Sequence, residues 1–193
     1  MLKLKLATDP RWVNIVEKNI EEILTDHAFC EQKAASNAIS IIVKHPEKTE
    51  MVTALLELAK EELTHFQMVH ERLVARGFTL GKERKDEYVN LLYQFMRSGG
   101  SRTTQLMDRL MFAAMIEARS CERFKVLSEN IKDAELSSFY RELMISEANH
   151  YTLFIGFAHQ YADGEDVDAR WNEWLAFEGE IIRQFGVKES IHG

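Results

Sequence analysis

Four long stretches of the chain place apolar residues at helical spacing, and each stretch carries one glutamate in phase with those residues near its middle. No run of alternating apolar and polar residues is long enough to predict a sheet. The pattern therefore predicts an all-α protein in which each of four helices turns one acidic side chain toward an apolar core. These glutamates are Glu31, Glu62, Glu117 and Glu147.

Proline, glycine and capping residues predict where the helices begin and end. The four long helices are expected at about 10–44, 49–75, 104–130 and 134–161, and a fifth, with two tryptophans, at about 167–185. Residues 77 to about 104 are expected to form a long crossover with an apolar patch around 91–96. Gly186 is expected to end the fifth helix, and the tail from about 187 to 193 is expected to be frayed.

The bulk properties favour one ordinary globular domain over residues 1–193, with 46% hydrophobic residues and a formal charge of −7. The apolar runs are too short to span a bilayer and the start lacks the apolar core of a signal peptide, so we expect a cytoplasmic protein. Its two cysteines, Cys30 and Cys121, form no CxxC pair, which excludes a zinc ribbon and an iron–sulfur signature.

The four in-phase glutamates indicate a metal site. Carboxylates buried together in an apolar core repel one another and lose hydration unless cations neutralise them. Two of the glutamates begin Glu-x-x-His motifs that end at His65 and His150, and a three-residue step on a helix lets carboxylate and imidazole reach one ion. Oxygen ligands with one nitrogen per metal suit iron or manganese.

One glutamate from each of two helices, plus Glu-x-x-His from each of the other two, is the ligand set of di-iron and di-manganese bundles. The sequence therefore predicts a ferritin-like four-helix bundle with a long crossover between the second and third helices and an extra C-terminal helix. The predicted metal ligands are Glu31, Glu62, His65, Glu117, Glu147 and His150. The predicted cofactor is two iron ions, with manganese as the other possibility.

The Glu-x-x-His motif alone is weak evidence, because roughly one match is expected by chance and the tail supplies another at Glu189 and His192. The stronger signal is the repeat: Glu31 precedes Glu62 by 31 residues, and Glu117 precedes Glu147 by 30.

Several alternatives remain beside this ligand set. The competing structural interpretation is a bundle with buried Glu–His and Glu–Arg pairs. His27 and Glu122 are the nearest rival ligands, and we expect each to be a neighbour instead. His45, His70 and His159 are expected at the surface or at helix ends.

Basic residues are concentrated around the crossover. Residues 72–109 carry a net charge of +4, which leaves −11 for the rest of the chain. This asymmetry points weakly to an anionic partner, whereas a solvated connection with mixed charges explains it equally well.

A reduced di-iron pair can pass electrons to O₂, so such a site predicts hydroxylation, desaturation, peroxide reduction or iron oxidation without choosing among them. The chain has no glycine-rich dinucleotide fingerprint and no cysteine cluster. An oxygenase of this kind therefore needs a separate electron-transfer reductase. Two rival functions are a ferritin-like ferroxidase and a peroxide-scavenging di-iron protein.

Four segments around the predicted ligands closely resemble the tRNA hydroxylases that act on 2-methylthio-N6-isopentenyladenosine beside the anticodon. They read LTDHAFCEQKAASNAIS, LAKEELTHFQMV, MIEARSCERFKVL and SEANHYTLF. The resemblance implies a di-iron monooxygenase that uses O₂ and an external electron donor to hydroxylate the isopentenyl side chain. It also gives the basic crossover a purpose, because Lys82, Arg84, Lys85, Arg97 and Arg102 could bind the phosphates of the tRNA substrate.

Overall fold

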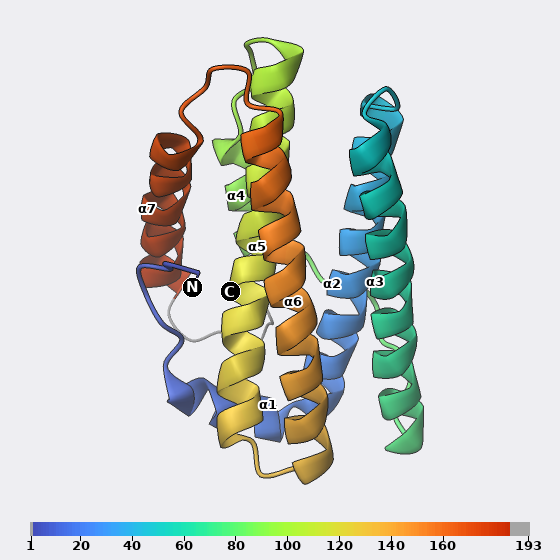
Figure 1. Cartoon of the computed structure of the whole chain (residues 1–193). Coiled ribbons are helices and arrows are strands. Elements are labelled where there is room, and N and C mark those ends of the chain that lie inside the picture. Colours follow the sequence, from blue (N-terminus) through green and yellow to red (C-terminus); the bar gives the residue numbers. More distant parts are fainter. Residues whose placement is uncertain (1, 186–193) are drawn as a thin grey trace. The chain divides into compact units, whose positions relative to one another are not determined.

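A computed structural model describes residues 2–185, and these residues form helices without a β-strand (Figure 1). The predicted stop at Gly186, the tail after it and the Glu189–His192 motif lie outside the described residues. The elements in chain order are η1 (Pro10–Trp12), α1 (Val13–Lys18), α2 (Ile20–Lys44), α3 (Thr49–Ala75), α4 (Glu87–Phe95), α5 (Arg102–Asn130), α6 (Ala134–Gln160) and α7 (Val167–Phe185).

The described chain divides into two compact units. One contains residues 16–85, with α2 and α3. The other contains the residues before 16 together with those from 86 onward, with α4, α5, α6 and α7. Each unit contains one pair of long, directly packed helices, α2 with α3 and α5 with α6.

In the unit of residues 16–85, a short turn joins α2 to α3 and lets the two helices pack side by side (Figure 1). Their apolar faces bury Leu24, Ala28, Leu55 and Val69. The predicted end of α3 is confirmed, because Gly77 takes φ +77° and the next amide, of Phe78, donates to the Leu73 carbonyl at 3.0 Å. This glycine closure satisfies carbonyls at the helix end that the helix itself leaves free.

The prediction of one continuous helix over about 10–44 is wrong at Asn19. The segment starts as expected, with Asp9 accepting a hydrogen bond from the Arg11 amide at 2.9 Å and Pro10 in the first position. Asn19, however, has φ −133° and ψ 42°, outside the helical region, and separates α1 from α2. At this helix start the Asn19 carbonyl accepts the first intrahelical bond, from the Ile23 amide at 3.0 Å, while the Asn19 side chain makes no capping hydrogen bond.

In the second unit, α5 packs against α6, and α4 and α7 pack against each other and against α5. The crossover contains a helix, α4, that was not predicted, and most of the expected apolar patch belongs to it. Asp86 caps this helix by accepting from the Val89 amide at 2.9 Å, and the helix buries Tyr88 and Leu92. Asp133 likewise caps α6, accepting from Glu135 at 3.0 Å and from Leu136 at 3.1 Å.

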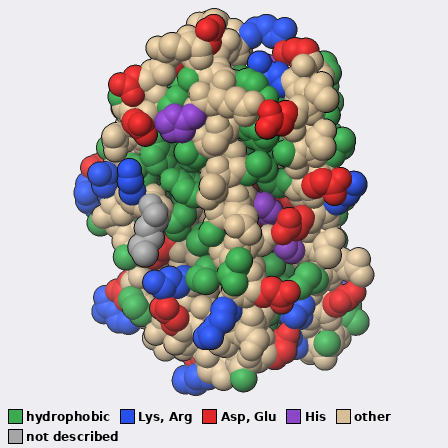
Figure 2. Space-filling view, viewed as in Figure 1, with side chains coloured by type: hydrophobic (Ala, Val, Ile, Leu, Met, Phe, Trp, Pro, Cys, Tyr) green, Lys and Arg blue, Asp and Glu red, His purple; other side chains and the backbone are tan. Residues whose placement is uncertain are grey.

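Acidic and basic side chains are interspersed on the surface seen in Figure 2, with hydrophobic side chains reaching the surface between them. The most exposed large hydrophobic residues include Val43, Val74 and Ile145. Among residues 2–185, none of the helices combines the length and the hydropathy that crossing a membrane requires.

Candidate metal centre

Three of the six predicted ligands form one cluster on α2 and α3, here called the α2–α3 half-site: Glu31, Glu62 and His65. All three side chains are buried, and one donor atom from each lies within 4.8 Å of the others. Nδ1 of His65 is 3.5 Å from Oε2 of Glu62 and 4.0 Å from Oε2 of Glu31. The three-residue step from Glu62 to His65 thus places both side chains toward the same point beside α2.

The other three predicted ligands form a matching cluster on α5 and α6, here called the α5–α6 half-site: Glu117, Glu147 and His150. They too are buried, with donor atoms within 4.8 Å of one another. Nδ1 of His150 lies 3.7 Å from Oε2 of Glu117 and 4.0 Å from Oε1 of Glu147. Each half-site therefore combines two carboxylates with one imidazole.

Each half-site fits one metal ion in both chemistry and spacing. Donor atoms bound to one ion at about 2 Å lie about 3–4 Å from one another, which matches the His-to-Glu separations in both clusters. Carboxylate oxygens with one imidazole nitrogen suit iron and manganese better than a structural zinc site. A cation would also offset the repulsion and lost hydration of two buried carboxylates.

His27 lies one turn before Glu31 on α2 and contacts that carboxylate directly. Its Nε2 is 2.6 Å from Oε1 of Glu31, and the imidazole is fully buried. The other carboxylate oxygen, Oε2, is the one near His65. His27 is thus a neighbour of the half-site, in agreement with the sequence-based expectation.

Glu122, the second rival ligand, belongs to a different group of residues. Its Oε1 accepts from the Thr8 amide at 2.8 Å, and its Oε2 accepts from the Thr8 hydroxyl at 2.6 Å and from Arg119 Nη1 at 2.9 Å. The carboxylate therefore ties the N-terminal segment to α5. The expectation that Glu122 leaves the apolar stripe of Glu117 agrees with this position.

The model of one family, described as tRNA-(MS[2]IO[6]A)-hydroxylase (MiaE), matches residues 2–193. The chain belongs to this tRNA hydroxylase family.

Two curated relatives support the membership in this tRNA hydroxylase family. A protein of Pseudomonas putida is 37% identical over 181 residues, which cover 93% of this chain and 86% of the relative. A protein of Salmonella typhimurium is 28% identical, with 86% of this chain and 77% of the relative covered. Both are named tRNA 2-(methylsulfanyl)-N(6)-isopentenyladenosine(37) hydroxylase.

A solved structure shares the fold of this tRNA hydroxylase family member. It is Protein 43 with aldehyde deformylating oxygenase activity from Synechococcus, which matches with a TM-score of 0.90 and 29% identity over 98% of this chain and 95% of that chain. The predicted fold class, all-α and ferritin-like, is confirmed.

The remaining histidines and the two cysteines are not among the predicted metal ligands. His159 is exposed and His70 is half-buried, while His45 caps the end of α2 as expected but is buried there. Cys30 and Cys121 are buried free thiols. Burial, together with the Glu122 and Glu117 carboxylates, raises the pKa of Cys121 to about 11.

The five residues predicted to contact tRNA fall into two groups. Lys82, Arg84 and Lys85 are exposed in the connection after α3, within the unit of residues 16–85. Arg97 and Arg102 are exposed in the other unit: Arg97 lies in the connection between α4 and α5, and Arg102 is the first residue of α5. The structure therefore places them as an exposed basic run of three and a separate pair.

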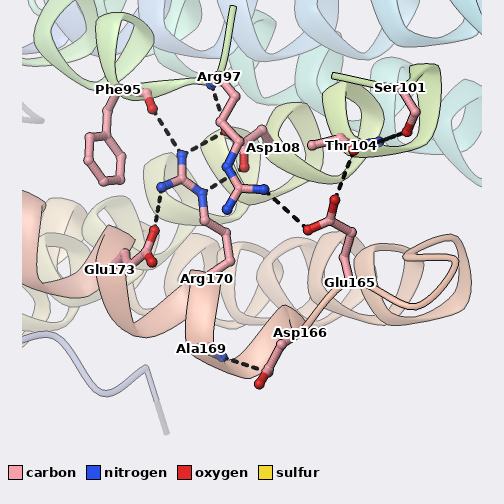
Figure 3. A network of polar contacts seen from close by, with 10 residues as sticks. All are labelled: Phe95, Arg97, Ser101, Thr104, Asp108, Glu165, Asp166, Ala169, Arg170 and Glu173. Atoms are coloured by element: carbon pink, nitrogen blue, oxygen red, sulfur yellow. Dashed lines mark hydrogen bonds and ion pairs between the residues drawn. The ribbon is translucent and has the colours of Figure 1, made fainter. Parts of the chain in front are cut away.

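Arg97 belongs to a polar network that fixes the connection between α4 and α5 (Figure 3). Its Nη1 lies 3.2 Å from Oε2 of Glu165, and its amide donates to Oδ2 of Asp108 at 2.7 Å. Arg170 donates two hydrogen bonds to the same Asp108 carboxylate, from Nε to Oδ1 at 2.8 Å and from Nη2 to Oδ2 at 2.7 Å. Its guanidinium carbon lies 4.5 Å from the centroid of the Phe95 ring. The Arg97 guanidinium is thus paired with Glu165, and the Arg97 backbone is held by Asp108.

Proposed function

We propose that this chain is an O₂-dependent di-iron monooxygenase that hydroxylates the isopentenyl side chain of 2-methylthio-N6-isopentenyladenosine in tRNA. The observation that carries the proposal is the pair of matching, buried Glu–Glu–His half-sites in a chain of the tRNA hydroxylase family. The names of both curated relatives supply the substrate.

The six half-site residues would together hold two iron ions, three protein ligands for each. When bound and reduced, the iron pair would supply electrons to O₂ and so the oxidising power needed to attack a C–H bond of the isopentenyl group. The four carboxylates neutralise the positive charge of the metal, while His65 and His150 each present a neutral nitrogen. Because all six side chains are buried, bulk water is kept from the reacting groups.

The overall reaction replaces one C–H bond of the isopentenyl group by C–OH. One atom of O₂ enters the product. The other is reduced to water, which consumes two electrons and two protons. The chain has no dinucleotide fingerprint and no cysteine cluster that could carry those electrons. We therefore assign the electrons to a separate reductase.

The exposed basic residues of the crossover would bind the tRNA backbone. Lys82, Arg84 and Lys85 are exposed and lie within four successive positions, with Glu83 between the first two. Glu83 pairs with Lys33 at 3.0 Å. Phosphates attract such side chains because binding releases counterions from the nucleic acid. Arg102 extends the set, whereas Arg97 would have to exchange Glu165 for a phosphate.

Nucleoside mass spectrometry of tRNA tests the proposal. Cells that make 2-methylthio-N6-isopentenyladenosine and express the chain should contain the hydroxylated nucleoside, and cells from which its gene is deleted should accumulate the unhydroxylated form. A deletion strain with an unchanged amount of hydroxylated nucleoside would refute the function. Re-expression of the Glu62→Ala variant provides the control, because it should leave the deletion uncorrected.

A further inference from the structure

The two half-sites share the same ligands but differ in what supports their first glutamate. In the α2–α3 half-site, Oε1 of Glu31 lies 2.6 Å from His27 Nε2. The residue one turn before Glu117 in the α5–α6 half-site is Ala113, which has no side-chain donor. The half-sites therefore differ at the position one turn before the first glutamate.

The His27 contact assigns separate tasks to the two oxygens of Glu31. An ionised carboxylate only accepts hydrogen bonds, so His27 carries its proton on Nε2 and donates it to Oε1. Oε2 then remains on the side of His65, 4.0 Å from Nδ1. Full burial of the imidazole and its position on the same helix fix this arrangement before any metal arrives.

We propose that His27 is a positioning residue that preorganises Glu31 and makes the α2–α3 half-site the tighter of the two metal positions. This inference rests on the proposed function, because it assumes that each half-site takes one iron. A ligand whose orientation is already fixed loses less conformational freedom on binding, and hydrogen-bonded partners of metal ligands typically contribute 10- to 100-fold in metal affinity.

The difference affects how each first glutamate is held. Oε1 of Glu31 accepts the hydrogen bond from His27, so Oε2 is the oxygen that remains toward His65. Ala113 occupies the matching position before Glu117 and offers no such hydrogen bond.

Anaerobic equilibrium dialysis of the apoprotein against Fe(II), with iron counted per chain, tests the inference. The unaltered chain should bind two ions in two steps of different affinity. His27→Ala should weaken the tighter step by about 10- to 100-fold and leave the weaker step unchanged. His27→Gln, whose amide nitrogen can reach the same carboxylate oxygen, should restore most of the loss.

Two further variants separate positioning from general stability. His45→Ala removes another buried histidine, the residue that caps the end of α2, and should keep both iron affinities. His27→Phe fills the space of the imidazole without a donor, so it should reproduce the alanine result even if the alanine variant does not fold.

Two outcomes would overturn the inference alone, and both are distinguishable from failure of the proposed function. If the unaltered chain binds two irons and His27→Phe binds them with the same two affinities, His27 does not position Glu31. Equal losses in the His27 and His45 variants would likewise assign the effect to stability. An unaltered chain that binds no iron would refute the proposed function together with the inference.

Discussion

Arg119 on α5 and Glu178 on α7 form a fully buried ion pair, with Nη2 2.6 Å from Oε1. The same carboxylate oxygen accepts from the Tyr88 hydroxyl at 3.3 Å, and Arg119 Nη2 also donates to the Leu6 carbonyl at 3.0 Å. Burial raises the pKa of Glu178, although Arg119 and Tyr88 act in the opposite direction. The pair joins α7, α4 and the N-terminal segment to the helix that carries Glu117.

Removing the carboxylate of this pair should strongly destabilise the fold. Glu178→Ala leaves the Arg119 guanidinium buried without its main counter-charge, so we expect a loss of about 3–5 kcal/mol in the free energy of unfolding by urea. Alanine substitution in the exposed Arg183–Glu180 pair, also on α7, should change it by less than about 1 kcal/mol. Similar losses for the two pairs would show that the buried pair does not secure α7.

The raised pKa of Cys121 predicts a pH-dependent stability. The folded thiol stays protonated up to a pKa of about 11, whereas the unfolded thiol ionises near 9.0. The folded chain therefore binds more protons between pH 9 and 11, and the contribution of the thiol to stability is present below pH 9 and lost across that window. The stability advantage of the unaltered chain over Cys121→Ala should shrink from pH 8 to 11. A constant difference would mean that the thiol has its ordinary pKa.

The exposed basic run after α3 should determine tRNA affinity through charge. Changing Lys82, Arg84 and Lys85 together to alanine should weaken tRNA binding and lower the slope of log affinity against log salt by about two to three. Lys60→Ala is the control, because this exposed lysine is on α3 and already pairs with Glu57 at 2.7 Å. An unchanged affinity and salt slope in the triple variant would show that the run is a bystander.

Metal content should distinguish Glu117 from Glu122, its acidic neighbour on α5. Glu117→Ala removes a carboxylate of the α5–α6 half-site, so elemental analysis should find at least one iron fewer per chain. Glu122→Gln should keep both irons, because that side chain contacts Thr8 and Arg119. Full iron retention in Glu117→Ala, with loss in Glu122→Gln, would transfer the ligand role to Glu122.

Helical periodicity, together with the proline, glycine and capping residues at helix ends, predicted most of the fold. The bounds of α3, the start of α7 and the break before α6 follow from local signals such as Gly77 and Asp133. The interruption at Asn19 has no proline or glycine to mark it, and it was missed. The helix α4 was recognised only as an apolar patch, although Asp86 in front of it is a capping residue.

The two clusters of predicted metal ligands could be found from the sequence, because helical phase places each residue on its helix and the glutamates repeat at a similar spacing between helices. The charged networks were not. Arg119 and Glu178 are separated by 59 residues, and Asp108 and Arg170 by 62, so no local pattern connects them. The sequence predicted that His27 lies near Glu31, but it does not reveal which carboxylate oxygen the imidazole contacts.

Oxygen-isotope labelling tests the central claim most directly. The purified, iron-loaded chain, supplied with a reductase, unhydroxylated tRNA and ¹⁸O₂, should yield a hydroxylated nucleoside that carries one ¹⁸O atom by mass spectrometry. The Glu62→Ala and His150→Ala variants should yield none. Absence of the hydroxylated nucleoside, or a hydroxyl oxygen that comes from water, would contradict an O₂-dependent monooxygenase built on these six residues.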